Sequence, residues 1–338
     1  MPVTLIRPSP PAEVANLRER RLRRGVLADR GRRLSVELVN NMPDAAVHAT
    51  QREFIRLLED GAGAFDVSLG LMSLSTVERS EKARRDMAEL YRSPAGFAAA
   101  APDAIIVTGA EPRAVELHEE PYWRELTDLF DAAQARAYAT LASCLAAHAL
   151  VLHRDGVRRR RSPRKWSGLY PTEIASAHPL TQGLSPGFTP HSRWNGLDEG
   201  DLVSKGYLVL TRAGEAGVDM FAKDEDHLAL FFQGHPEYDG DTLAREYRRD
   251  VSRALNGAPA PAPPANYYDA QTEARLGAHV AGMIAGREAP QMPVYAMIGP
   301  QPRWRAQGAQ AISNWLAAVA ARKAAANGPT FSRARFGG

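Results

Sequence analysis

Short apolar runs alternate with longer amphipathic stretches through the first half of the chain. The short runs predict strands, and the stretches with apolar residues three or four positions apart predict helices. Strands that alternate with helices of about 10–15 residues indicate βαβ units around a parallel sheet. The predicted strands are residues 34–40, 65–74, 103–109 and 137–143, and the predicted helices are residues 49–61, 80–92, 121–134 and 145–153.

After Gly156 the pattern changes to short strands and turns, which we expect to complete the sheet and add a hairpin beside it. These strands are predicted over residues 166–175, 204–212, 218–223 and 227–233, with an amphipathic helix over residues 242–257 and a C-terminal helix over residues 304–326. Residues 257–265 form a stiff proline-rich linker. The predicted parts are an N-terminal basic arm over 1–33 with a short helix near Ala12–Arg24, an α/β domain over 34–257, a linker and irregular segment over 258–303, and a C-terminal helix and tail over 304–338, with Asn327–Gly338 as the tail.

Composition points to a soluble enzyme of ordinary make-up. The chain has 338 residues, 44% hydrophobic and 24% charged, with a single cysteine that cannot form an internal disulfide. A chain without disulfides fits a reducing cytoplasm. No stretch approaches the roughly 20 apolar residues that cross a membrane, and the N-terminus lacks the layout of a signal peptide. We therefore expect a cytoplasmic protein without a membrane partner.

Basic residues are clustered although the net charge is only +3. One run is Arg18–Arg24, and another is Arg158–Arg161 followed by Arg164 and Lys165. Such runs are usually solvated faces, and neither is interleaved with aromatic residues, so no nucleic-acid partner is expected. The second run could also meet an anionic cosubstrate such as coenzyme A.

The single cysteine, Cys144, stands where the strand 137–143 turns into the helix 145–153. A lone cysteine is most often a small buried hydrophobe. However, ligands of parallel sheets bind at the carboxyl ends of the strands, and both Gly109 and Cys144 follow such ends. The N–H groups and the positive end of the following helix favour the thiolate, which is the nucleophilic form. Cys144 is therefore a candidate nucleophile.

A thiol nucleophile needs a base, and the base needs an orienting group. His235 and Glu237 follow a predicted strand and are two residues apart, so in an extended stretch they point to the same side. His148 competes as the base, but it lies one turn into the helix after Cys144. The oxyanion that forms during attack needs fixed donors, and we assign them to the backbone of Leu145 and of Gly109–Ala110.

A set of strings in order from about residue 34 to 320 resembles the homoserine O-acyltransferase family, also called homoserine O-succinyltransferases or transsuccinylases. The strings are Asn41-Met42-Pro43, Val107-Thr108-Gly109-Ala110, Tyr122-Trp123, Cys144, Pro190-His191-Ser192-Arg193, Gly234-His235-Pro236-Glu237-Tyr238-Asp239, Arg249-Asp250 and Asn314-Trp315-Leu316. The resemblance implies a flavodoxin-like α/β fold related to class I glutamine amidotransferases, and a cytoplasmic homodimer. It also makes residues 34–257 the catalytic domain.

The resemblance further implies an enzyme of methionine biosynthesis that acts on L-homoserine, with acyl-coenzyme A as co-substrate and no bound cofactor or metal. Cys144 matches the residue that carries the acyl group as a thioester, His235 the base and Glu237 its partner. The substrate-binding residues of the family match Lys165, Ser192 and Arg249. A guanidinium holds a carboxylate through two parallel hydrogen bonds, which agrees with the last assignment.

The chain departs from its family at two positions near this site. The family carries lysines after Met-Pro, where this chain has Asp44-Ala45-Ala46, and it has glycine or glutamate where this chain has Arg113. Arg113 is the acyl-specificity position. Its guanidinium could pair with a succinyl carboxylate, its length could admit only a small acyl group, or it could point outward. The segment after Thr76 also lacks the family's usual string.

The leading hypothesis is therefore succinyl transfer from succinyl-coenzyme A to homoserine. The alternatives are a paralogue that uses acetyl-coenzyme A or acts on serine, a glutaminase-like hydrolase, and a non-catalytic binder. Glutaminases usually have glycines two positions before and after the cysteine, where this chain has Ala142 and Ala146. The hydrolase therefore ranks below the transferase.

Overall fold

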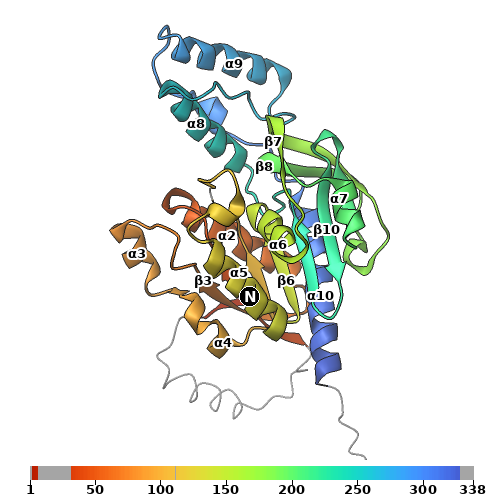
Figure 1. Cartoon of the computed structure of the whole chain (residues 1–338). Helices are drawn as coiled ribbons and strands as arrows, with labels where there is room; N and C mark the ends of the chain where they lie inside the picture. Colours follow the sequence, from red (N-terminus) through yellow and green to blue (C-terminus); the bar gives the residue numbers. More distant parts are fainter. Residues whose placement is uncertain (1, 7–31, 111, 328–338) are drawn as a thin grey trace, which may run out of the picture.

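The computed structural model describes residues 2–6, 32–110 and 112–327 (Figure 1). Its strands form one mixed sheet in the order β1-β3-β2-β5-β6-β11-β10-β9-β7-β8, with β4 beside β3. Among the described helices, none is long and apolar enough to cross a membrane. The predicted helix near Ala12–Arg24 and most of the predicted tail lie outside the described residues.

The strands from β1 to β11 in this order form the parallel part of the sheet, as the alternating pattern predicts. The registers align Val39 with Val107, Val107 with Ala142, and Ser143 with Phe232. The loops that follow these strands therefore meet at one edge of the sheet. The strands are β1 (Val3–Leu5), β2 (Arg33–Val39), β3 (Asp66–Met72), β4 (Tyr91–Arg92), β5 (Ala104–Val107), β6 (Ala139–Ser143) and β11 (Leu228–Phe232).

Helices cover both faces of the parallel part and enclose two apolar cores. One core holds Phe130 of α5 (Trp123–Arg136) and Leu150 of α6 (Leu145–Asp155). The other holds side chains of α2 (Asp44–Gly61) and α10 (Arg305–Ala326), including Trp315, which is fully buried. Because α10 contacts α2 directly, the C-terminal helix is part of the main fold (Figure 1).

The remaining strands are antiparallel and include the predicted hairpin. They are β7 (Arg160–Ile174), β8 (Gly187–Gly196), β9 (Leu208–Ala213) and β10 (Val218–Asp224). The long β7–β8 hairpin ends the sheet. Pro190 of β8 accepts a hydrogen bond from the N–H of His235 over 2.8 Å, so this hairpin lies against the loop that follows β11.

Several elements differ from the sequence prediction. The helix expected over 80–92 ends at Met87 as α3 (Glu81–Met87), and β4 takes its last residues. Helix α2 begins at Asp44, five residues early, because Pro43 is extended and directly precedes it. Strand β8 was not predicted, since it carries few apolar residues in alternation. The short elements α4 (Phe97–Ala100) and α7 (Glu199–Ser204) were missed as well, and α7 precedes β9 where a strand was expected from residue 204.

The prediction of an irregular segment over 258–303 is wrong for its central part. Residues 258–264 have no helix or strand, but α9 (Ala270–Ile284) follows with Asp269 as its cap. Its Leu276 and Val280 pack against α8 (Thr242–Leu255) in a separate small core. The many prolines on both sides of α9 concealed its apolar spacing. The sequence therefore indicated the stretch without helix or strand correctly, but did not predict the helix α9 that follows it.

Candidate active site

Cys144 forms a sharp turn between β6 and α6. Its backbone has φ 53° and ψ −113°, a conformation that residues with a side chain rarely adopt. Its N–H donates to the carbonyl of Phe232 over 2.7 Å, which ties the turn to the next strand. Strain of this kind costs about 1–3 kcal/mol and persists mainly at functional sites. Because the residue is strained and only half-buried, a mere packing role does not explain it.

His235 and Glu237 form a buried pair on the loop after β11. The Nδ1 atom of His235 lies 2.8 Å from Oε1 of Glu237, and the imidazole stacks on Tyr238 with ring centroids 4.2 Å apart. Because a carboxylate accepts the hydrogen bond, Nδ1 carries a proton and Nε2 is left for another partner.

Cys144 is the other group that acts on this ring. Burial lowers the pKa of His235, but the Glu237 carboxylate and Cys144 outweigh burial and raise this pKa well above its usual value. The structure thus brings together the three residues that the sequence proposes for catalysis.

The competing base, His148, is engaged elsewhere. Its Nε2 lies 3.0 Å from Oε1 of Gln233, and the ring is buried. Burial and the nearby Arg193 guanidinium lower the pKa of His148 to about 3. It is therefore a neutral ring held by Gln233, and His235 remains the candidate base.

The backbone groups proposed as oxyanion donors lie on adjoining strand ends. A β-carbon added to Gly109 would come within 3.2 Å of the backbone nitrogen of Leu145, so a side chain here would require Leu145 to shift by a few tenths of an ångström. The loop is held by Thr108, whose hydroxyl accepts from the N–H of Asn41 over 2.9 Å and donates to the carbonyl of Gly109 over 3.0 Å. Ala110 follows at the margin of the core.

Two of the three predicted substrate-binding residues meet at one carboxylate. Nζ of Lys165 donates to Asp250 over 2.6 Å, and Nε of Arg249 donates to the other oxygen of Asp250 over 3.0 Å. Burial raises the pKa of Asp250, but the two cations lower it on balance. Ser192 lies on β8, opposite Ser167 of β7. The sequence alone gave Asp250 no role of its own, because it was noted only as the neighbour of Arg249. That its carboxylate pairs with both cations was not predicted.

Arg113 lies on the loop between β5 and α5, and its side chain is 62% exposed. Its guanidinium donates to Glu78 over 2.8 Å, while its N–H donates to Glu120 over 2.6 Å. The loop is thus held by the buried Glu120, and the exposed Arg113 side chain extends toward Glu78.

The other departure, Ala45, lies in the first turn of α2. The neighbouring Asp44 accepts from the Ser80 N–H over 2.8 Å and from Arg79 over 3.3 Å. The Arg79 guanidinium also donates to the carbonyl of Met42 over 2.6 Å. An arginine that the sequence reasoning did not single out therefore lies beside the segment where the family's lysines are missing.

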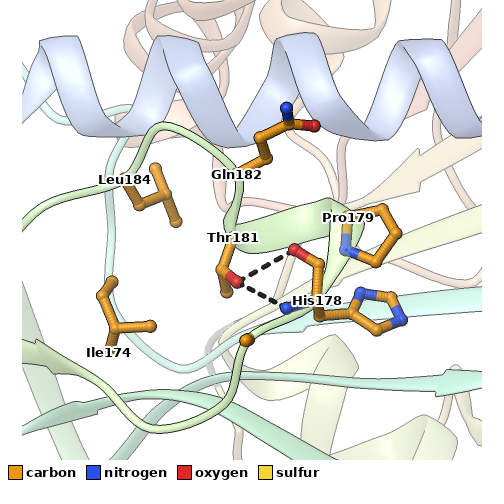
Figure 2. A pocket seen from close by; sticks show the side chains of 7 residues that line it. Ile174, His178, Pro179, Thr181, Gln182 and Leu184 are labelled. Carbon is orange, nitrogen blue, oxygen red and sulfur yellow. Dashed lines mark hydrogen bonds between the residues drawn. The ribbon is translucent and has the colours of Figure 1, made fainter.

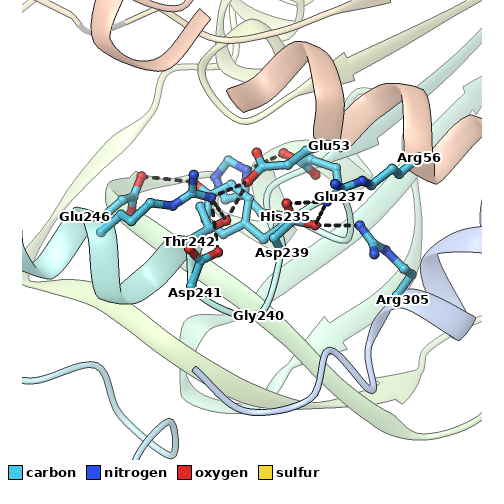
Figure 3. A network of polar contacts seen from close by, with 12 residues as sticks. Glu53, Arg56, His235, Glu237, Asp239, Gly240, Asp241, Thr242, Glu246 and Arg305 are labelled. Carbon is cyan, nitrogen blue, oxygen red and sulfur yellow. Dashed lines mark hydrogen bonds and ion pairs between the residues drawn. The ribbon is translucent and has the colours of Figure 1, made fainter. Parts of the chain in front are cut away.

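A network of polar side chains from neighbouring helices stabilises the loop that carries His235 and Glu237 (Figure 3). Arg56 of α2 donates both to Oδ1 and to Oδ2 of Asp239, at 2.9 and 2.8 Å, and Arg305 of α10 donates to the same carboxylate over 2.9 Å. The buried Glu53 accepts from Thr242 over 2.5 Å, and burial raises the pKa of Glu53 to about 7. Helices distant in sequence thus fix the loop that carries the base.

The basic run that begins just before β7 and continues into it has partners already. Arg161 lies 4.7 Å above the ring of Trp194, and Arg159 donates to the carbonyl of Val115. Three others form ion pairs: Arg158 with Glu116, Arg160 with Asp198 and Asp201, and Arg164 with Glu215. The run therefore forms an ion-paired surface, and coenzyme A binding there stays a prediction.

A surface hollow of about 450 Å³ lies beside the 3-10 turn Pro179–Thr181 (Figure 2). Its wall is stabilised by the Thr181 hydroxyl, which accepts from the N–H of His178 over 2.9 Å. Neither Cys144 nor His235 lines this hollow. Within the described residues, no group of three or more His, Cys, Asp or Glu side chains could hold a metal ion.

A family model described as homoserine O-succinyltransferase matches residues 23–325. A protein of that name from Methylorubrum extorquens is 45% identical over 302 residues, which cover 87% of this chain and 90% of that protein. Another from Rhodopseudomonas palustris is 46% identical over 258 residues, 75% of this chain and 78% of that protein. One from Allochromatium vinosum is 36% identical over 297 residues, 85% of this chain and 83% of that protein.

Among solved structures, a glutamine amidotransferase from Methylobacillus flagellatus gives a TM-score of 0.45 at 14% identity, over 86% of this chain and 93% of that one. The protein SMU.1228c gives 0.46 at 14% identity, over 84% and 99%. Scores this low decide nothing, and the fold class rests on the strand order and pairing described above. The sequence matches, in contrast, extend over most of the chain, which belongs to the homoserine O-succinyltransferase family.

Proposed function

We propose that this chain is an acyltransferase that moves a succinyl group from succinyl-coenzyme A to the hydroxyl of L-homoserine through a thioester on Cys144. The observation that carries the proposal is the strained Cys144 turn beside the buried His235–Glu237 pair. This arrangement occurs in a chain whose relatives, over most of its length, are named homoserine O-succinyltransferases. The product would then enter methionine biosynthesis.

In the first half-reaction, the Cys144 thiolate attacks the carbonyl carbon of the acyl thioester. The negative charge moves to the carbonyl oxygen, and we assign the N–H groups of Leu145 and of the Gly109–Ala110 segment as the donors that stabilise it. The bond from the carbonyl carbon to the coenzyme A sulfur then breaks. The coenzyme A thiolate takes the proton held by His235 and leaves, so the acyl group remains on Cys144.

In the second half-reaction, His235 takes the proton of the homoserine hydroxyl as the hydroxyl oxygen attacks the acyl carbon. The carbon–sulfur bond to Cys144 breaks, and the ester leaves. Glu237 holds Nδ1 in the protonated form, so that Nε2 is free both to accept and to return the proton. The same imidazole therefore serves both steps.

We assign the amino-acid part of homoserine to Arg249, Lys165 and Ser192. The guanidinium of Arg249 suits the carboxylate, and Asp250 holds Arg249 and Lys165 next to each other. We also propose that Arg113 favours a dicarboxylic donor by leaving Glu78 and pairing with the distal carboxylate of the succinyl group. The homodimer and the cytoplasmic location remain predictions from the family resemblance.

A substrate matrix tests this function. Acetyl-, propionyl- and succinyl-coenzyme A are each combined with homoserine and with serine, and release of free coenzyme A is measured. The proposal expects the fastest turnover with succinyl-coenzyme A and homoserine, and parallel double-reciprocal lines because coenzyme A leaves before the amino acid reacts. A preference for acetyl-coenzyme A or for serine would contradict the substrate assignment. Glutamine hydrolysis without acyl transfer would support the hydrolase instead.

A further inference from the structure

A buried arginine outside the proposed catalytic residues lies at the same edge of the sheet as Cys144. Arg79 is on the loop between β3 and α3, and its side chain is only 6% exposed. The acyl-transfer steps proposed above do not use it. A buried guanidinium is costly unless its donors find acceptors, so the contacts of this side chain need an explanation.

The guanidinium of Arg79 binds the loop that follows β2. Nη1 donates to the carbonyl of Met42 over 2.6 Å, and Nη2 donates to the carbonyl of Asn40 over 3.2 Å. Nη2 also donates to Oγ of Ser73 over 3.0 Å, and Asp44 accepts from Nη1 over 3.3 Å. Buried backbone carbonyls need partners also where a strand has ended. The arginine supplies them for two carbonyls just beyond β2.

The carbonyl of Asn40 and the N–H of Asn41 are the two ends of one peptide group. Arg79 binds the carbonyl end, and the N–H end donates to the hydroxyl of Thr108 over 2.9 Å. That hydroxyl in turn donates to the carbonyl of Gly109 over 3.0 Å. Asn41 and Thr108 are 2% and 3% exposed, so these bonds are shielded from water. A continuous path of hydrogen bonds therefore joins Arg79 to the backbone of Gly109.

This path ends beside the turn that carries the nucleophile. A β-carbon on Gly109 would lie 3.2 Å from the backbone nitrogen of Leu145, the residue after Cys144. The carbonyl of Gly109 and the N–H of Ala110 again belong to one peptide group. Because a peptide group is planar, a bond that holds its carbonyl also fixes the direction of its N–H. That N–H is one of the donors assigned above to the oxyanion.

We propose that Arg79 is a positioning residue that orients the peptide group between Gly109 and Ala110, and with it the oxyanion donor, through Asn41 and Thr108. This inference rests on the proposed acyl transfer, because only a reaction that passes through an oxyanion needs this donor. Arg79 does not touch the reacting atoms. Its planar fork binds two carbonyls at once, which a single nitrogen does less well.

Other contacts of the same loop act on different groups. The side chain of Asn40 donates to the carbonyl of Val47 over 2.8 Å, and its oxygen accepts from the N–H of Met42 over 3.2 Å. These bonds tie the loop to α2 and close it on itself. Neither reaches the peptide group that leads to Thr108. Among the described residues, Arg79 is therefore the donor that holds the carbonyl end of that group.

Two reagents separate the oxyanion donor from the thiol. Acetylation of Cys144 by p-nitrophenyl acetate passes through an oxyanion before p-nitrophenolate leaves. Alkylation by iodoacetamide displaces iodide at a saturated carbon and forms no oxyanion. The thiolate is the attacking group in both reactions, and the chain has no other cysteine. Both rates are measured on the full chain, by p-nitrophenolate release and by intact mass.

The variant Arg79→Gln should slow acetylation and leave alkylation unchanged. Since loss of a whole oxyanion donor slows acyl transfer by about 100- to 1,000-fold, a displaced donor should slow it by about tenfold. Arg79→Lys keeps the charge without the fork and should slow acetylation less. Arg84→Gln, on an exposed arginine of α3, is the matched control for both rates. A merely structural role for Arg79 would slow both reactions together.

Thr108→Val tests the path itself, because it removes the hydroxyl and keeps a similar shape. Acetylation alone should slow, and the double variant with Arg79→Gln should be no slower than the slower single variant, since both changes break one path. Losses that multiply, or equal slowing of both reactions, would overturn the proposal. So would a ratio of the two rates in Arg79→Gln equal to that in Arg84→Gln, or in Arg79→Lys if the first variant does not fold. The probes need neither succinyl-coenzyme A nor homoserine, so a selective loss in a protein that transfers no succinyl group would refute the substrate assignment and support this inference.

Discussion

The Glu237→Gln substitution examines the contact that defines the base. The change keeps the size of the side chain and removes its charge, 2.8 Å from Nδ1 of His235. The carboxylate is the largest influence that raises the pKa of this buried imidazole. Its loss should therefore lower the pKa of His235 and weaken the imidazolium that accompanies the Cys144 thiolate.

The magnitude follows from the burial of the pair. Glu237 is 2% exposed, so solvent screens the interaction little. A hydrogen bond to a charged partner contributes about 1.5–3 kcal/mol. At about 1.4 kcal/mol for each unit, the pKa of His235 should fall by about one to two units. We expect acyl transfer at pH 7 to slow by about 10- to 100-fold, because less of the enzyme has the thiolate–imidazolium pair.

Two measurements check this prediction. Titration of the imidazole signals by NMR should show the highest of the histidine transitions moving down in the variant, and the pH dependence of the transfer rate should follow it. Glu81→Gln, on an exposed carboxylate of α3, serves as the control with the same chemistry. If Glu237→Gln leaves both the titration and the rate equal to those of Glu81→Gln, the assignment of Glu237 is refuted.

Three further predictions concern the strained turn, the acyl group and acid stability. Cys144→Gly should be inactive yet more stable than Cys144→Ala by about 1 kcal/mol in urea unfolding, because glycine tolerates the positive φ; equal stabilities would contradict backbone strain. Arg113→Gly should reduce the preference for succinyl- over acetyl-coenzyme A by about tenfold in competition assays, the value of one charged hydrogen bond; an unchanged ratio would make Arg113 a surface residue. The pKa values of the buried His148, His191 and His227 rings are lowered to about 3, about 4 and about 4, so the unfolded chain takes up protons below about pH 6.5 while these rings do not. Burial raises the pKa values of Glu37 and Glu53 to about 7, so these two carboxyls act in the opposite direction, and His235, whose pKa is also raised, keeps its stabilising effect throughout this range. Three rings outweigh two carboxyls, and the free energy of unfolding should fall between pH 6.5 and pH 4; a rise would refute this balance.

The sequence was sufficient for the parallel half of the fold because its strands are buried on both faces. Runs such as Ile105–Val107 are apolar at every position, and the helices between them have regular spacing. Strand β8 and helix α9 carry no such signal. The pattern of β8 is dominated by residues such as His191 and Arg193, whose burial depends on partners from β10 and on backbone carbonyls. Local sequence does not reveal such partners.

The same distinction applies to the site. Cys144, His235 and Glu237 could be singled out as candidates because Cys144 follows a strand end and the proposed base and its partner are two residues apart. The positive φ of Cys144 could not, because the turn is held by a hydrogen bond to Phe232 on a neighbouring strand, which the local sequence does not reveal. Nor could the pairing of Lys165 with Asp250, which are 85 residues apart. Charged residues in a sequence predict function poorly until the fold shows which of them are paired.

The thioester on Cys144 is the central claim, and a single measurement addresses it. The protein is mixed with succinyl-coenzyme A in the absence of homoserine, quenched in acid, and analysed by intact-mass and peptide mass spectrometry beside Cys144→Ala. We predict one added succinyl group, located on the peptide that contains Cys144, absent from the variant and lost when homoserine is supplied before the quench. An unmodified protein that nevertheless turns over, or an adduct that persists in Cys144→Ala, would contradict the account.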